Sequence, residues 1–359
     1  MDCPYLASIG YGEFRQRLRR QIAGHRIPLA GSLELTFRCN LRCRHCYVAH
    51  GHSGIAGGRE LALAEIDRIL GEAAGEGCLW LLLTGGEPLI RRDFPEVWAA
   101  AKRRGLLVTL FTNGTLLSPA VADTLAEYRP FNLEITLYGA TQETYERVTG
   151  VPGSHERCLR GIELLRERRI PFKLKTVVMT LNRHELAGMQ AFAGDLGADF
   201  RYDPMINAGA DRSAGPLAWR LSPQEVVELE QRDPKRAEGW RSLHDRMKEV
   251  RRDPGFLYTC GAGLHSFHID PHGKLSLCMM ARQPSYDLGE GSFRQGWQDA
   301  LARERFRAPE GPYACGECRL LPVCGQCPGW AATEHGRPQE PVPHLCQVAH
   351  LRAEVFGLS

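Results

Sequence analysis

Short β-rich runs alternate with amphipathic helical patterns over residues 33–203, and this rhythm constrains the fold more than any other feature of the chain. The run "CLWLLLT" at 78–84 is apolar on both faces, which is typical of a strand buried inside a parallel sheet. The segment "RELALAEIDRILGEAAGEG" that precedes it has apolar residues at helical spacing. Such alternation indicates an α/β fold in which helices cover a parallel sheet.

Six strand–helix units are expected in this region. The expected strands are 32–38, 78–84, 106–112, 131–139, 171–179 and 199–204, and the expected helices between them are 59–77, 93–105, 118–128, 154–169 and 182–197. An eight-unit barrel takes roughly 250 residues, and about 170 residues fit only six units. The sequence therefore predicts a partial (β/α)6 TIM-like barrel whose strand-following loops share one face, where barrel enzymes place their chemistry.

The remainder of the chain differs in character. Residues 205–256 combine a loop-like Gly/Asp/Ser-rich stretch with charged helical patterns, and "SFHIDPHGKLSLCMM" is expected to form a β-hairpin around its D-P-H-G turn. We divide the chain into an N-terminal extension (1–31), the barrel (32–204), a linker with helices (205–256), a small cysteine-rich domain that contains the hairpin (257–350) and a C-terminal tail (351–359).

Charge and hydropathy restrict the partners and the compartment. The net charge of +3 is too near neutral to favour nucleic acid or a membrane surface as a partner. No apolar run approaches the roughly 20 residues of a membrane span, and the N-terminus lacks a signal-peptide core. We therefore expect a cytoplasmic protein. Its 13 cysteines are an odd number in a leaderless chain, which favours metal sites over a disulfide scaffold.

Three of these cysteines crowd the loop after the first expected strand. Cys39, Cys43 and Cys46 lie in "FRCNLRCRHCYV" at residues 37–48. A closed zinc site needs four ligands, so a Cys3His zinc site would recruit one of the nearest histidines, which are His45, His50 and His52. The alternative is a [4Fe–4S] cluster, and with only three thiolates one iron would stay open for an outside ligand.

The cysteine loop resembles the C-x3-C-x-φ-C signature of radical S-adenosylmethionine (SAM) enzymes, with His45 at the position usually held by an aromatic residue. The resemblance implies that the open iron binds the amino and carboxylate groups of SAM. An electron from a low-potential donor, of the flavodoxin or ferredoxin type, then cleaves SAM to methionine and a 5′-deoxyadenosyl radical. That radical removes a hydrogen atom from the substrate, which acid–base side chains cannot do.

The same resemblance implies SAM contacts on the loops after the following strands. "GGEP" at 85–88 matches the turn after the family's second strand, Asn113 lies in "TNG", and Thr136 lies in "ITLYG". Arg157, with Arg147 as the alternative, would pair with the SAM carboxylate. Without the resemblance, these features would be ordinary turns and solvated helix charges. The expected SAM-binding residues are His45, Gly85, Gly86, Glu87, Pro88, Asn113, Thr136 and Arg157.

A second group of seven cysteines fills the C-terminal region. C-x2-C-x5-C-x2-C alone would fit a zinc ribbon, but the whole set resembles the SPASM extension of radical SAM enzymes, which holds auxiliary iron–sulfur clusters. The resemblance implies that one cluster has an open iron or a further ligand, such as His265 or His268, besides its three thiolates. The expected ligands are Cys260, Cys278 and Cys327 for that first auxiliary cluster, and Cys315, Cys318, Cys324 and Cys346 for the second.

SPASM relatives mostly modify ribosomally made peptides or protein side chains by crosslinking or oxidation, so a peptide or protein is the expected substrate. Met279 follows Cys278, where sulfatase-maturing relatives carry an Asp, which argues against that activity. Few residues precede the first strand, so we expect any leader peptide to be bound by a small separate protein. The alternatives are a tetrapyrrole or another small molecule as the substrate, and a non-catalytic zinc-binding protein.

Overall fold

The computed structural model describes residues 10–48, 58–248 and 255–358. His50 and His52, which were considered as zinc ligands, lie outside these residues. The described chain forms a nine-stranded sheet with the order β6-β5-β4-β3-β2-β1-β7-β8-β9. The strands are β1 (Ala30–Glu34), β2 (Trp80–Thr84), β3 (Leu107–Thr112), β4 (Asn132–Thr136), β5 (Lys173–Val177), β6 (Asp199–Asp203), β7 (Ser266–Ile269), β8 (Lys274–Ser276) and β9 (Tyr286–Asp287).

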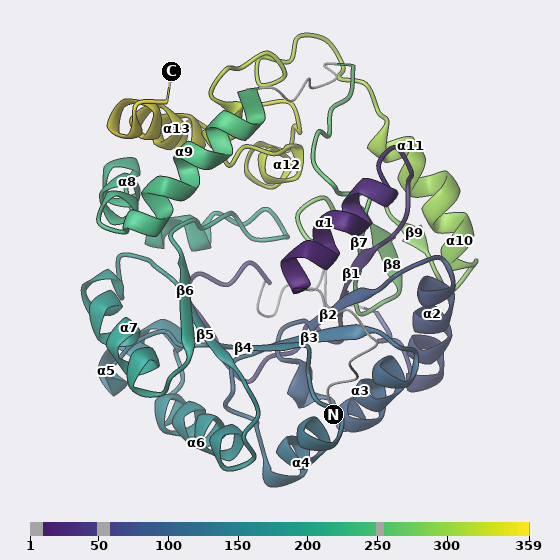
Figure 1. The fold of residues 1–359 in the computed structure, drawn as a ribbon, viewed down its shortest axis with the longest axis vertical. Helices are drawn as coiled ribbons and strands as arrows, with labels where there is room; N and C mark the ends of the chain where they lie inside the picture. Colours follow the sequence, from purple (N-terminus) through teal and green to yellow (C-terminus); the bar gives the residue numbers. More distant parts are fainter. Residues whose placement is uncertain (1–9, 49–57, 249–254, 359) are drawn as a thin grey trace.

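Strands β1 to β6 are parallel neighbours in chain order, and helices flank the outside of their curved sheet (Figure 1). The predicted partial barrel is therefore confirmed, with every strand within a few residues of its expected place. Helix α5 was not anticipated. The helices of this part are α2 (Leu63–Gly75), η1 (Pro88–Ile90), α3 (Phe94–Arg103), α4 (Pro119–Glu127), α5 (Gln142–Thr149), α6 (Ser154–Glu167), η2 (Arg183–Glu185) and α7 (Leu186–Asp195).

The two faces of the barrel strands have different tasks. In β3, Val108 and Leu110 are fully buried and belong to the main hydrophobic core, which also contains Trp98 of α3. Side chains alternate along a strand, so Phe111 projects to the opposite face, where it lines a cavity. The outer face of the strands packs against the helices, and the inner face lines the cavity.

The C-terminal hairpin joins the same sheet. β7 pairs in parallel with β1, with Ala30 opposite Ser266, and β8 returns antiparallel to β7. The predicted hairpin is confirmed, but its attachment to β1 was not anticipated, because the two segments lie far apart in sequence. The domain boundaries stay a prediction, and the expected start of the tail at residue 351 falls inside helix α13 (Pro343–Phe356).

Helices α8 (Pro223–Gln231), α9 (Pro234–Lys248), α12 (Pro328–His335) and α13 gather at one end of the molecule (Figure 1). A buried ion pair between Glu230 of α8 and Arg352 of α13, with Nε–Oε2 and Nη2–Oε1 distances of 2.7 Å, holds these two helices together. The other elements of the linker and the C-terminal region are η3 (Gly215–Trp219), α10 (Phe293–Gln295), a π-helix η4 (Gly296–Leu301), α11 (Ala302–Arg305) and η5 (Leu321–Val323).

Helix α1 (Tyr11–Gln21) lies across the amino ends of the barrel strands. The ring of Tyr11 packs 6.4 Å from that of Trp80, at the start of β2, and 5.1 Å from that of Phe131, just before β4. The open, loop-bearing end of the barrel is therefore the opposite one. None of the helices in the described part of the chain has both the length and the apolar character of a membrane span.

Candidate functional site

A cavity of about 300 Å³ opens at the carboxyl ends of the barrel strands. The thiols of Cys39, Cys43 and Cys46 line it, and burial raises the pKa of Cys39 to about 11 and that of Cys46 to about 12. Such thiols stay protonated at neutral pH unless a metal displaces the proton. The lining residues are Cys39, Leu41, Cys43, His45, Cys46, Tyr47, Val48, Thr84, Gly85, Gly86, Phe111, Thr112, Asn113, Thr136, Tyr138, Lys175, Val177, Met205, Ile206, Asn207 and Met279.

The two glycines of "GGEP" clamp the chain that leads into the cysteine loop. Gly86 N donates to Thr36 O at 2.7 Å, and Glu87 N donates to Arg38 O at 2.9 Å. A Cβ on Gly85 would lie 2.5 Å from Thr36 O, and one on Gly86 would lie 2.3 Å from Arg38 O. Gly85 also has a φ of +146°, which favours glycine. The glycines therefore allow two backbone segments to touch directly beside the thiols.

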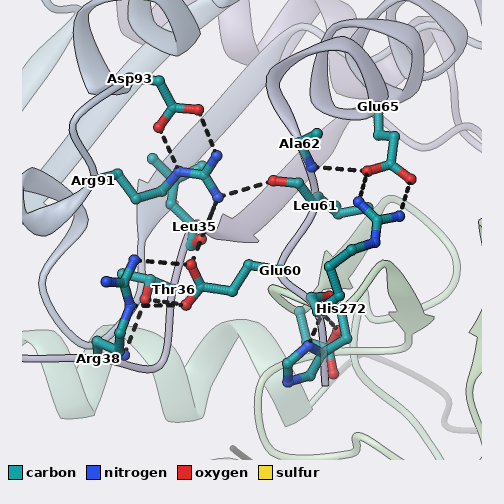
Figure 2. A network of polar contacts seen from close by, with 12 residues as sticks. Leu35, Thr36, Arg38, Glu60, Leu61, Ala62, Glu65, Arg91, Asp93 and His272 are labelled. Carbon is teal, nitrogen blue, oxygen red and sulfur yellow. Dashed lines mark hydrogen bonds and ion pairs between the residues drawn. The ribbon is translucent and has the colours of Figure 1, made fainter. Parts of the chain in front are cut away.

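A network of polar side chains also holds the segment that leads into the cysteine loop (Figure 2). Arg91 donates to Leu35 O at 3.2 Å and forms a bidentate pair with Asp93, whose N–O distances are 2.9 and 2.7 Å. Glu60 accepts from Thr36 Oγ1 and from Arg38, whose Nη2 lies 3.0 Å from Oε2. The residues just before Cys39 are thus held by both main-chain and side-chain contacts, which pre-organises the loop.

Glu87 lies behind the cavity wall. Its buried carboxylate accepts from Leu89 N at 3.1 Å, Thr112 Oγ1 at 2.7 Å and Asn113 N at 2.7 Å, and burial raises its pKa to about 7. Glu87 thus joins the loops after β2 and β3 to each other. Pro88, which begins η1, does not line the cavity either. The expected roles of Glu87 and Pro88 in SAM binding stay predictions.

The other expected SAM contacts divide into two groups. His45, Asn113 and Thr136 line the cavity together with both glycines. His45 is half-buried, its buried Nδ1 has no hydrogen-bond partner among the described residues, and desolvation lowers its pKa to about 4. Arg157 lies apart on α6, where its guanidinium donates to Pro152 O at 3.4 Å. Arg147 donates to Leu181 O at 2.9 Å and does not line the cavity.

The seven C-terminal cysteines separate into two electrostatic neighbourhoods. Burial, with a smaller contribution from the nearby thiols of Cys278 and Cys260, raises the pKa of Cys327 to about 11. Burial likewise raises the pKa of Cys315 to about 11, and there the neighbouring thiols are Cys346, Cys324 and Cys318. The division of these cysteines into two auxiliary ligand sets stays a prediction. In the part of the chain that the structure describes, no three His, Cys, Asp or Glu side chains converge as around a single metal ion.

A buried ion cluster, formed by Glu34, His268, Arg282 and Tyr47, connects the barrel to the segment after Cys278. Arg282 donates to both oxygens of Glu34, at 2.8 and 2.9 Å, and Tyr47 Oη donates to Oε1 at 3.2 Å. Burial would raise the pKa of Glu34, but His268 and Arg282 outweigh it and hold the pKa at about 2.

The two histidines considered as auxiliary ligands differ in their surroundings. His268 is fully buried, with Nδ1 2.9 Å from Ser32 Oγ and Nε2 3.2 Å from Arg282 Nη1. Both of its ring nitrogens therefore face groups other than a thiol. His265 Nδ1 is buried and has no hydrogen-bond partner in the described residues, so His265 is the better candidate of the two.

The open barrel and its thiol-lined cavity define an enzyme that works at the carboxyl ends of its strands. The chain belongs to the radical SAM superfamily, because residues 33–193 match the family model of that description and a full-length relative is 30% identical. Membership implies a [4Fe–4S] cluster and SAM as cofactors, and it makes the protein a radical SAM enzyme.

Three known proteins show the extent of the similarity. An AdoMet-dependent heme synthase of Methanosarcina barkeri is 30% identical over 89% of this chain and 97% of its own. The mycofactocin maturase MftC of Mycobacterium ulcerans is 30% identical over 84% and 83% of the two chains. The structure of Streptococcus suis SuiB bound to its precursor peptide SuiA superposes with a TM-score of 0.67 at 17% identity, covering 94% of this chain and 82% of SuiB. SuiB shares the fold.

Several cavity residues were not anticipated from the sequence. Tyr138 packs its ring 5.0 Å from that of His45, and Met205, Met279 and Lys175 line other parts of the wall. Lys175 lies in the expected strand "PFKLKTVVM", where lysines alternate with apolar residues. A charged residue within a predicted barrel strand is a visible signal, but it identifies a cavity residue only once the inward face of the strand is known.

The Gly86 contact gives a testable consequence. In Gly86→Ala, the new Cβ meets a main-chain carbonyl, so the residues before Cys39 must shift. We expect SAM cleavage to 5′-deoxyadenosine to fall about tenfold because positioning errors near 1 Å cost this much or more. The matched control is Gly194→Ala on α7, where an added Cβ meets nothing within 4 Å. Equal activity of Gly86→Ala and the control under dithionite would contradict the clamp.

Proposed function

We propose that Cys39, Cys43 and Cys46 hold the SAM-binding cluster and that the two C-terminal thiol sets hold auxiliary clusters. The donor chemistry supports this assignment. Three thiols from one loop line a cavity that also contains glycine main chain, Asn113 and Thr136, which suit a polar nucleotide. When bound, the cluster and SAM supply a 5′-deoxyadenosyl radical. The chain's own residues orient SAM and exclude water, with the loops after β1, β2 and β3 joined by Glu87 and the two glycines.

The substrate in this proposal is a ribosomally made peptide or a protein side chain, which the enzyme crosslinks or oxidises. The observation that carries it is the similarity to the mycofactocin maturase over most of both chains. The SuiB fold, solved with a precursor peptide, is consistent with it. A separate leader-binding protein and an electron donor of the flavodoxin or ferredoxin type complete the proposed system.

A tetrapyrrole substrate is the second candidate. It is favoured by the 30% identity to a heme synthase that the alignment covers almost completely, 97% of its length. The two candidates share the same cofactor chemistry and differ in the shape and polarity of the molecule that enters the cavity.

Anaerobic reconstitution tests the cofactor assignment. We expect a brown protein with about ten to twelve iron atoms per chain that forms 5′-deoxyadenosine after reduction with dithionite. A colourless protein that contains zinc would contradict it.

Co-expression with short peptides encoded beside the gene tests the substrate. We expect a defined change in the mass of one peptide and a stimulation of 5′-deoxyadenosine formation by that peptide. Stimulation by tetrapyrrole precursors, with no peptide modified, would favour the second candidate instead.

A further inference from the structure

The cavity wall contains one charged side chain that the cofactor assignment does not use. Lys175 of β5 is the one Lys, Arg, Asp or Glu residue among the described residues that line the cavity. Its side chain is only 16% exposed. Because a buried ammonium group is costly unless it is paired, its partners indicate what it is placed to bind.

Lys175 shares its protein partner with another cation. Its Nζ lies 3.4 Å from Glu134 Oε2, and the same oxygen accepts from Arg201 Nε at 3.0 Å. The other oxygen of Glu134 accepts from Asn132 Nδ2 at 2.9 Å. One carboxylate therefore faces two cations, which leaves one positive charge in excess at this wall. An ammonium group has three donors, and Glu134 is its single anionic neighbour at ion-pair distance among the described residues.

The ring of Phe111 lies beside the ammonium group of Lys175 in the cavity wall. Its Nζ lies over the ring of Phe111, 2.8 Å from the centroid, and Phe111 also lines the cavity. An aromatic face stabilises a cation but supplies no counter-charge. Burial lowers the pKa of Lys175 to about 7, and Glu134 acts in the opposite direction. An anion that enters the cavity would therefore strengthen the charged form.

The position of Lys175 separates it from the cysteine loop. In the sheet it pairs with Thr136, two residues before β5 ends at Val177, and four strand-to-strand steps separate β5 from β1. The thiols lie on the loop that follows β1, beyond its carboxyl end. Lys175 thus faces the cavity from a wall other than the cysteine loop, at the level of Thr136 in the sheet.

We propose that Lys175 is a substrate-binding residue that pairs with a carboxylate of the substrate inside the barrel. This inference rests on the proposed function, because it takes the cavity as the reaction site. It narrows the substrate to molecules that present an acidic group there, such as an acidic side chain or a chain terminus of a peptide. The carboxylate of SAM itself is the competing source of the same chemistry.

Ligand-observed NMR on the oxidised, anaerobic holoenzyme with SAM present tests the proposal. The probes are N-acetylglutamate and its neutral counterpart N-acetylglutamine, both at millimolar concentration. We expect the acid to bind the wild type and to bind Lys175→Met about tenfold more weakly, since one charge-assisted hydrogen bond accounts for such a factor. Lys175→Arg should restore binding. The matched control is Lys173→Met, because Lys173 lies on the same strand, is 44% exposed and pairs with Asp199 at 2.9 Å.

Each contrary result has a distinct meaning. Equal binding of acid and amide, or equal binding of the acid by Lys175→Met and Lys173→Met, would overturn the proposal. Weaker SAM binding by Lys175→Met, measured from the EPR spectrum of the reduced cluster, would assign Lys175 to the SAM carboxylate and also overturn it. The NMR comparison does not depend on SAM cleavage, so a preparation that binds the acid but lacks an EPR-active cluster would contradict the proposed function alone.

Discussion

Replacing Cys43 by alanine is expected to abolish reductive SAM cleavage and to remove about four iron atoms per chain. Cys43 lines the cavity between Cys39 and Cys46, and burial raises its pKa well above the usual range, with both neighbouring thiols adding to the increase. Such a thiol has little reactivity of its own and becomes a thiolate when it binds metal. Iron content and 5′-deoxyadenosine formation with dithionite are the two measurements.

Two further cysteine variants make the result specific. Cys158→Ala is the matched control, because Cys158 is fully buried on α6 and belongs to none of the proposed ligand sets. It should keep its iron and its activity. Cys318→Ala should lose about four iron atoms from the second auxiliary set and still cleave SAM when dithionite supplies the electron. If Cys43→Ala kept both its iron and its activity, the cysteine loop would not hold the SAM-binding cluster.

The partial barrel was predictable because its strands are apolar on the outer face and punctuated by turns. "LLVTLFT" became β3 (Leu107–Thr112), and the residues that line the cavity after β1, β2 and β3 follow these strands directly. The order of parallel strands then brings Gly85, Asn113 and Thr136 to one cavity. Local sequence patterns were therefore sufficient to predict cavity-lining residues where a motif directly follows a strand.

The remainder depended on contacts between distant segments. The pairing of β1 with β7 joins residues 30–33 to 266–269, and nothing local in either segment specifies the partner. The same pairing brings Arg282 to Glu34. Lys175 and Glu34 were visible as charges within predicted strands, but the sequence alone does not show which face of a strand points into the barrel. Arg157 of α6 does not line the cavity and donates to Pro152 O instead, so its expected pairing with the SAM carboxylate stays a prediction.

Replacing Glu34 by glutamine is expected to destabilise the fold by about 3 kcal/mol, at the lower end of the cost of breaking a buried ion pair. Glu34 has no exposed surface, and its two oxygens accept from Arg282 at 2.8 and 2.9 Å. The variant leaves the Arg282 guanidinium, whose side chain is 16% exposed, without a counter-charge at that position. Urea unfolding under anaerobic conditions, followed by tryptophan fluorescence, gives the change in unfolding free energy.

Because the Glu34–Arg282 pair is buried, its loss should cost more stability than the loss of an exposed ion pair of similar geometry. Glu65 pairs with Arg59 through two N–O contacts of 2.6 Å, but their side chains are 30% and 71% exposed, so Glu65→Gln should have a much smaller effect. The double variant Glu34→Met/Arg282→Met should recover part of the lost stability, because it removes the unpaired charge together with its partner. If Glu34→Gln and Glu65→Gln unfolded at the same urea concentration, the attachment of the C-terminal segment would not depend on this pair. In that case the strand pairing of β1 with β7 and the packing around it would hold the segment against the barrel by themselves.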